Sequence, residues 1–136
     1  MTDFYMAAHA LIRKDELFLA TRRSEINDYM PLKWDVPGGF VESGESMEVA
    51  LKREIQEETN ITVIVDKVLY IYSNLSQLPN KQVFQAVYLC EYADGEIKIN
   101  PEEHDQYTWI KKEKFLELDA ISFLESFLRQ GILETL

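Results

Sequence analysis

The chain has 136 residues, with 46% apolar and 28% charged side chains and a formal net charge of -10. These values describe one ordinary globular domain, residues 1–136, and they exclude a disordered or fibrous chain. So acidic a protein is also a poor partner for a nucleic-acid polymer, whose backbone is bound by clustered lysine and arginine. An anionic ligand would need positive charge from elsewhere, and a divalent cation is the obvious source.

No apolar stretch approaches the roughly 20 residues that span a bilayer, and residues 1–16 lack the pattern of a signal peptide. The single cysteine, Cys90, lies in VFQAVYLCEY, where a buried strand thiol is expected rather than a catalytic one. One cysteine permits no intrachain disulfide, which fits a reducing compartment. We therefore expect a cytoplasmic protein without a membrane partner.

The first third of the chain predicts a β-hairpin and a short strand. FYMAAHALI and LFLATRR are apolar runs on either side of a polar tetrad, residues 13–16. Residues 24–33 carry Asn, Asp and Pro and predict a loop. WDV then predicts a short strand, which Pro37-Gly38-Gly39 is expected to end in a tight turn.

The next segment predicts a helix over residues 47–59, because Ser46 is a favourable N-cap and neither proline nor glycine follows. Asn60 can adopt the left-handed conformation that ends a helix. Residues 61–75 and 82–92 predict a second hairpin with its turn at 76–81.

Further along, residues 96–99 predict a short strand, 100–106 a polar loop and 107–110 another strand. Residues 111–131 are helical in pattern, with Gly131 a plausible C-cap. These elements predict an α+β fold, an α/β/α sandwich in which a central and a C-terminal helix flank a mixed sheet.

The central helix places acidic side chains among its apolar ones. At 100° per residue, Glu54 and Glu58 fall within the apolar arc that contains Leu51 and Ile55, and Glu57 borders it. A solvated face is the usual explanation of a glutamate-rich helix, but here other polar residues already occupy the opposite arc. Buried carboxylates without compensation cost several kcal/mol and repel one another. We therefore expect a compensating positive charge beside this helix.

Arg53 is one compensating charge, since it lies four residues before Glu57 and can bind a carboxylate with both arms of its guanidinium. A single arginine cannot neutralise three or four glutamates. Clusters of carboxylate and carbonyl oxygens bind hard divalent cations such as Mg²⁺, often together with substrate phosphates. The charge pattern therefore predicts a metal site on the helix.

The spacing of these residues resembles the signature of the Nudix hydrolase family, G-x5-E-x7-R-E-U-x-E-E-x-G-U, where U is aliphatic. Gly39, Glu45 and the run Arg53-Glu54-Ile55-x-Glu57-Glu58-x-x-Ile61 match eight of its nine specified positions. Asn60 stands where the family has glycine, and asparagine is the other residue that readily adopts the left-handed region. Outside the box, WDVPGGFVE and EEHDQYTWI also resemble family segments. The likeness in order of elements covers nearly the whole chain and is strongest with the MutT-like branch.

The resemblance implies hydrolysis of a nucleoside diphosphate linked to another moiety, with Mg²⁺ or Mn²⁺ as cofactor. By position in the box, Glu54, Glu57 and Glu58 are the expected metal ligands. The Gly38 carbonyl is expected to join them, because a Gly-Gly segment lets the backbone approach a ligand closely. Glu54, Glu57 and Arg53 are expected to carry catalysis, with Arg53 orienting carboxylates.

Glu45 is expected to complete the Arg53 ion-pair network and to bind metal through water. The general base comes from the box or from a downstream loop in this family. Glu103 is the loop residue we favour and Glu102 the alternative, while both could equally be solvated loop charges. Arg22 and Arg23 could reach phosphate, and Tyr29 could stack on a base, although a plain surface role is the commoner one for such arginines.

The expected partner is a small nucleotide, and the protein is expected to be a monomer or a homodimer. A (deoxy)nucleoside triphosphate, cleaved to monophosphate and pyrophosphate, is the favoured substrate. A nucleotide sugar of the ADP-ribose type is the alternative, for which Pro79, 18 residues after Ile61, is a weak indication. A Nudix-fold sensor that binds nucleotide without turnover is a third reading, disfavoured because the carboxylate set is intact.

Overall fold

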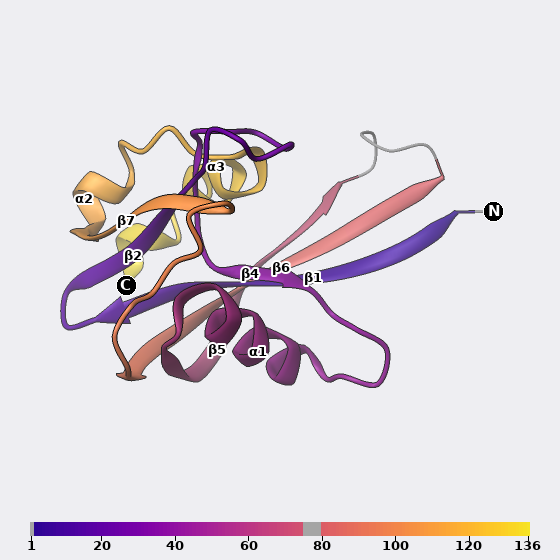
Figure 1. The fold of residues 1–136 in the computed structure, drawn as a ribbon, viewed down its shortest axis with the longest axis horizontal. Helices are drawn as coiled ribbons and strands as arrows, with labels where there is room; N and C mark the ends of the chain where they lie inside the picture. Colours follow the sequence, from indigo (N-terminus) through magenta and orange to yellow (C-terminus); the bar gives the residue numbers. More distant parts are fainter. Residues whose placement is uncertain (1, 75–79) are drawn as a thin grey trace.

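The computed structural model describes residues 2–74 and 80–136, and in them a seven-stranded mixed sheet lies between helices (Figure 1). The strands are β1 (Asp3–Lys14), β2 (Leu17–Arg23), β3 (Trp34–Asp35), β4 (Gly38–Phe40), β5 (Thr62–Asn74), β6 (Lys81–Asp94) and β7 (His104–Lys111). The helices are α1 (Met47–Thr59), α2 (Lys112–Phe115) and α3 (Ser122–Arg129), followed by a 3₁₀ turn, Leu133–Thr135.

The strand order is β3-β2-β1-β6-β5, with β4 paired to β1 and β7 paired to β2. Strands β1 and β6 run parallel over eleven paired positions, from Asp3 opposite Lys81 to Arg13 opposite Glu91. The other pairs, including the β1–β2 and β5–β6 hairpins predicted from the sequence, are antiparallel. The sheet is therefore mixed, as expected.

Side chains alternate along β1 and fill a separate core on each face of the sheet. Ala10 and Ile12 point to the face covered by α1, where they pack with Leu51 and Ile55. Leu11 points to the other face, into the core that contains Phe127 of α3. Figure 1 shows α1 below the sheet and α2 and α3 above it, which confirms the expected α/β/α sandwich.

Helix α1 has the ends that its sequence predicts. The Ser46 hydroxyl accepts a hydrogen bond from the Val49 N–H at 3.2 Å, and Asn60 adopts the left-handed conformation with φ 65°. The Asn60 N–H donates to the Gln56 carbonyl, so the helix end is closed without the glycine of the family signature.

Three expectations about local structure are wrong. Gly38 and Gly39 form the start of β4 instead of a turn, because this segment pairs with β1. Residues 96–99 are irregular instead of a strand, since the backbone N–H of Lys98 donates to Thr59 at the end of α1. His104, expected in a polar loop, is buried at the start of β7.

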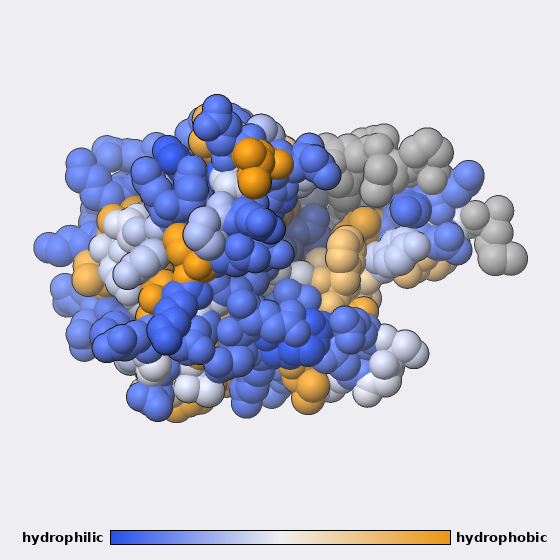
Figure 2. Space-filling model, viewed as in Figure 1, coloured by the Kyte–Doolittle hydropathy of each residue, from blue (hydrophilic) through white to orange (hydrophobic). Residues whose placement is uncertain are grey.

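The predicted turn at 76–81 and the indication from Pro79 lie mostly outside the described residues. Within the described part of the chain, no helix is long and apolar enough to cross a membrane. Cys90 is fully buried, and burial raises the pKa of its thiol to about 12, so the expected structural role is confirmed. Hydrophilic residues dominate the face shown in Figure 2, with hydrophobic residues in small groups.

Candidate active site

Strand β4 brings two glycines against neighbours that leave no room for a side chain. A Cβ on Gly39 would lie 2.5 Å from the carboxyl carbon of Glu54, and a Cβ on Gly38 would lie 2.2 Å from the Ala8 carbonyl oxygen. The Gly38 N–H donates to Glu58 Oε2 at 3.0 Å. The Gly-Gly pair is thus required for close approach between β4, β1 and the carboxylates of α1, not for a turn.

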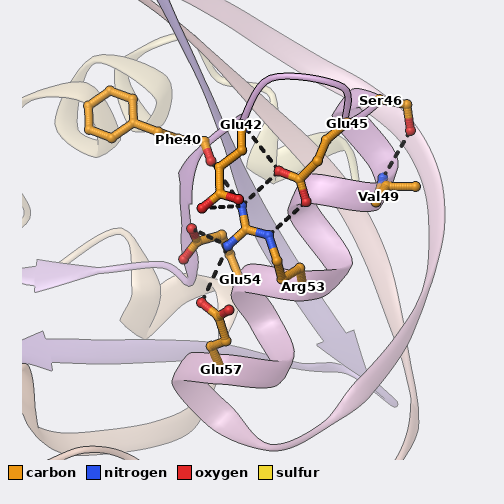
Figure 3. A network of polar contacts seen from close by, with 8 residues as sticks. All are labelled: Phe40, Glu42, Glu45, Ser46, Val49, Arg53, Glu54 and Glu57. Atoms are coloured by element: carbon orange, nitrogen blue, oxygen red, sulfur yellow. Dashed lines mark hydrogen bonds and ion pairs between the residues drawn. The ribbon is translucent and has the colours of Figure 1, made fainter.

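Arg53 is the centre of an ion-pair network at the N-terminal half of α1 (Figure 3). Its Nε and Nη2 bind the two oxygens of Glu45 at 2.7 and 2.9 Å. Its Nη1 donates to Glu54 at 3.0 Å and to Glu57 at 3.3 Å. Nη2 also donates to the Phe40 carbonyl at 3.2 Å, so one guanidinium joins β4, the loop before α1 and the helix.

This network divides the carboxylates of the box by their electrostatic environment. The two-pronged bond from Arg53, helped by the Glu42 N–H, lowers the pKa of Glu45 to about 2. Burial raises the pKa of Glu54, and the nearby Arg53 opposes that shift. Glu57 has 59% of its side chain exposed, which agrees with its place at the border of the apolar arc on the helical wheel.

The other end of the site holds two acids, the half-buried Glu58 and the buried Asp35. Burial raises the pKa of Glu58 well above its usual value, and the charges of Asp35 and Glu54 raise it further. Burial also raises the pKa of Asp35 to about 6, although Arg23 lies 3.3 Å away and the Val36 N–H donates to it. Asp35 was not predicted from the sequence, and its place three residues before Gly38 in WDVPGGFVE was the available signal.

The loop before β7 approaches the same carboxylates. The charge of Glu103 contributes to the raised pKa of both Glu54 and Glu58, whereas Glu102 does not appear among their charged neighbours. Ser24 fixes this loop, since its N–H donates to the Glu103 carbonyl and its hydroxyl to the Glu102 carbonyl. The effect of the Glu103 charge on Glu54 and Glu58 therefore favours Glu103 over Glu102 as the loop residue that acts on the box.

A cavity of about 650 Å³ opens beside Glu58 and Gly38, on the α3 side of the sheet. Arg23 and Tyr29 line it, and the Arg23 guanidinium lies 5.5 Å from the centre of the Tyr29 ring. Arg22 does not line it and instead holds Asp105 through two hydrogen bonds of 2.9 Å. The structure thus brings two of the three proposed substrate contacts together and leaves Arg22 outside.

The donor set around Glu58 suits a hard cation, because it consists of carboxylate and backbone oxygens. Raised pKa values at Glu54 and Glu58 indicate that positive charge is lacking there, which a divalent ion would supply. Among residues 2–74 and 80–136, no three acidic, histidine or cysteine side chains are already grouped at metal-ligand spacing. Arg53 holds Glu54 and Glu57 instead, so a bound ion would compete with Arg53 for these two carboxylates.

The fold, the carboxylate-rich helix and the adjoining cavity define the class of hydrolases that act on phosphoanhydrides with the help of a metal ion. A model of the NUDIX domain matches residues 4–130, and the chain belongs to the Nudix family. It is therefore an enzyme, a pyrophosphohydrolase that acts on nucleotide pyrophosphate linkages, and Nudix hydrolases generally use divalent metal ions.

Several relatives are similar over most of their length. The nucleoside triphosphatase NudI of Escherichia coli (strain SE11) is 32% identical over 118 residues, which cover 80% of this chain and 83% of NudI. The MutT protein of Methanosarcina mazei Go1 superposes with a TM-score of 0.82 at 30% identity, covering 98% of this chain and 96% of that one. A MutT Nudix hydrolase of Burkholderia pseudomallei shares the fold, with a TM-score of 0.79 at 23% identity over 94% of this chain and 98% of its own.

Proposed function

We propose that the substrate is a (deoxy)nucleoside triphosphate, which the enzyme cleaves to a nucleoside monophosphate and pyrophosphate. The observation that carries this proposal is the cavity of about 650 Å³ that begins at Glu58 and Gly38, because it offers a nucleotide-sized space next to the carboxylates. The similarity to nucleoside triphosphatase NudI supports it.

The residues that would hold Mg²⁺ or Mn²⁺ are Glu54, Glu57, Glu58 and the Gly38 carbonyl, with Glu45 acting through water. Such an ion, when bound, supplies positive charge to the phosphate oxygens and to the attacking water. The low pKa of Glu45 keeps that carboxylate ionised, so its bond to Arg53 persists through the working pH range.

The chain's own groups position the reactants. Arg53 orients Glu54 and Glu57 from the side of α1, while its own charge stays on the helix and outside the cavity lining. Glu103 is proposed as the general base, since its carboxylate lies near Glu54 and Glu58 on a loop that Ser24 fixes. Arg23 and Tyr29 are proposed to contact the phosphates and the base respectively.

The experiment is a substrate panel with Mg²⁺ or Mn²⁺: nucleoside triphosphates, nucleotide sugars and dinucleotides, with release of phosphate and pyrophosphate measured separately. We expect pyrophosphate and monophosphate from triphosphates, at a kcat/KM at least about tenfold above that for nucleotide sugars. A preference for ADP-ribose or another nucleotide sugar would contradict the triphosphate proposal and identify a nucleotide sugar as the substrate. Binding of nucleotides without turnover of any would identify a sensor.

The cytoplasmic location and the monomeric or homodimeric state stay predictions from the sequence. Sedimentation of the purified protein measures the oligomeric state directly.

A further inference from the structure

The floor of the cavity contains a row of side chains that crosses four strands. Ala7 of β1 lies opposite Phe40 of β4 and opposite Gln85 of β6, and Gln85 lies opposite Tyr72 of β5. All four residues line the cavity. Because Ala7 has only a methyl group, this row leaves open space on the floor of the cavity, with an amide beside it and an aromatic ring at each end.

The row lies at a suitable distance from the carboxylates. Gly38, which holds Glu58, pairs with His9 and therefore belongs to the next row along the strands. Two rows are about 7 Å apart and two strand spacings are about 10 Å, so Gln85 lies roughly 12 Å from Gly38. This is the span of a nucleotide from its phosphates to the outer edge of its base.

The start of α3 forms another wall of the cavity. Phe123 and Ser122 line the cavity, and the Phe123 ring lies 4.1 Å from the ring of His9. His9 is buried, and burial lowers its pKa to about 4, so the ring is neutral near pH 7. Among the described residues its Nδ1 is the one buried side-chain polar atom that makes no hydrogen bond. Unpaired buried polar groups are rare and mark sites where a ligand or function offsets the cost.

We propose that Gln85 reads the hydrogen-bonding edge of the nucleobase and is the residue that sets base preference in this enzyme. The proposal rests on the proposed function, which places the phosphates at Glu58 and Gly38. The Gln85 amide presents one donor and one acceptor side by side, and a base presents the same pair on its edge. Tyr72 and Phe40 supply the aromatic surfaces that flank the base.

Because the Gln85 amide both donates and accepts hydrogen bonds, replacing it should shift base preference in a predictable direction. The Gln85 side chain hydrogen-bonds to His9, whose neutral ring can donate or accept, so the amide can still turn over. Wild-type Gln85 therefore accepts a base with either an amino or an oxo group. A carboxylate in its place only accepts hydrogen bonds, which suits an amino group and leaves an oxo group without a donor. The variant Gln85→Glu should therefore favour amino bases over their oxo counterparts.

The measurement is kcat/KM for two matched pairs, dCTP against dUTP and dATP against dITP, at pH 7 and pH 8.5. In Gln85→Glu we expect the amino-to-oxo ratio of at least one pair to rise about tenfold over wild type. A general loss of affinity from the added negative charge cancels in this ratio. Gln85→Leu, which has neither donor nor acceptor, should lower kcat/KM for both members of that pair.

Gln82→Glu is the matched control, because Gln82 lies on the same strand, points to the α1 face and does not line the cavity. It makes the same change of charge and should leave both ratios within about twofold of wild type. The proposal is overturned by an unchanged ratio in Gln85→Glu at both pH values, or by an equal shift in Gln82→Glu.

Failure of the proposed function is a separate outcome. If wild type cleaves no triphosphate, titration calorimetry with dCMP and dUMP in EDTA still measures base preference without turnover. A dCMP-to-dUMP affinity ratio that rises about tenfold in Gln85→Glu supports base reading in that case as well. Equal ratios in wild type and variant overturn it.

Discussion

The two ends of the acidic site differ in how their carboxylates are paired with positive charge. At the Arg53 end, four contacts from one guanidinium neutralise Glu45 and hold Glu54 and Glu57 at the edge of solvent. At the Glu58 end, the half-buried carboxylate receives one hydrogen bond from the Gly38 N–H, while Asp35 adds a like charge. One end has an arginine beside its carboxylates and the other has none beside Glu58, and we propose that a cation binds at the second end.

The largest effect should come from removing a charge at the Arg53 end. We expect Glu57→Gln to lower kcat by about 10³-fold, because the amide keeps the shape of the side chain but not the charge that holds a divalent ion. Steady-state rates at saturating Mg²⁺ measure this. Glu48→Gln, on the exposed first turn of the same helix, is the control and should keep its rate. A near-normal rate in Glu57→Gln would remove Glu57 from the metal ligands.

Replacing the central cation should disturb the Arg53 end selectively. Lysine keeps the charge but cannot bind Glu45 with two arms and reach Glu54 and Glu57 as well. For Arg53→Lys we expect kcat/KM and Mg²⁺ affinity to fall about 10- to 100-fold, as for other residues that orient metal ligands. Activity titrated against Mg²⁺ separates the two quantities. An unchanged Mg²⁺ affinity would show that Arg53 does not position the ligands.

At the Glu58 end, removing a charge should stabilise the metal-free protein. Folding raises the pKa of Glu58, so stability is lost as pH rises from the ordinary glutamate value through the raised one. In EDTA at pH 8, Glu58→Gln should raise the free energy of unfolding by about 1–3 kcal/mol, and the Gln carbonyl can still accept from Gly38.

Urea denaturation at pH 8 and pH 4.5 measures this effect, and the gain should shrink at the lower pH. Added Mg²⁺ should stabilise wild type more than the variant. A variant less stable than wild type at pH 8 in EDTA would mean that the Glu58 end is not short of positive charge.

The smallest effect concerns the protonation of His104, which adds a positive charge near Arg23. Burial lowers the pKa of His104 to about 4, and Arg23 lowers it further. The unfolded chain therefore binds the proton first, and stability is lost as pH falls from 6.5 towards 4. Between pH 7 and 5.5 His104 should account for about 1 kcal/mol of lost stability.

His104→Gln should flatten the pH dependence of unfolding by that amount, whatever its effect on stability at pH 7. His9, with a pKa lowered to about 4 in the same way, contributes a slope of the same sign. Urea denaturation at both pH values measures the slope, and an unchanged slope would show that His104 is not held neutral by the fold.

Local features of this protein were predictable from sequence because they depend on neighbours a few residues away. The spacing of Ser46, the charged positions and Asn60 is enough to set the ends of α1 and the contact of Arg53 with Glu57. The hairpins and the two-sided sheet follow from alternating side chains in the same way.

The burial of each carboxylate and the lining of the cavity were decided only by the tertiary structure. The helical wheel placed Glu58 inside the apolar arc and Glu57 at its border, but it could not show what each carboxylate contacts, because that depends on where β4 crosses the helix. Asp35, Gln85 and Phe123 come from three distant segments and meet only because β1 pairs in parallel with β6 and α3 closes over them. The sequence by itself determined a carboxylate helix that needs a cation, since helix geometry is local. Which carboxylates lack charge, and what lies beside them, required the packing of the whole sheet.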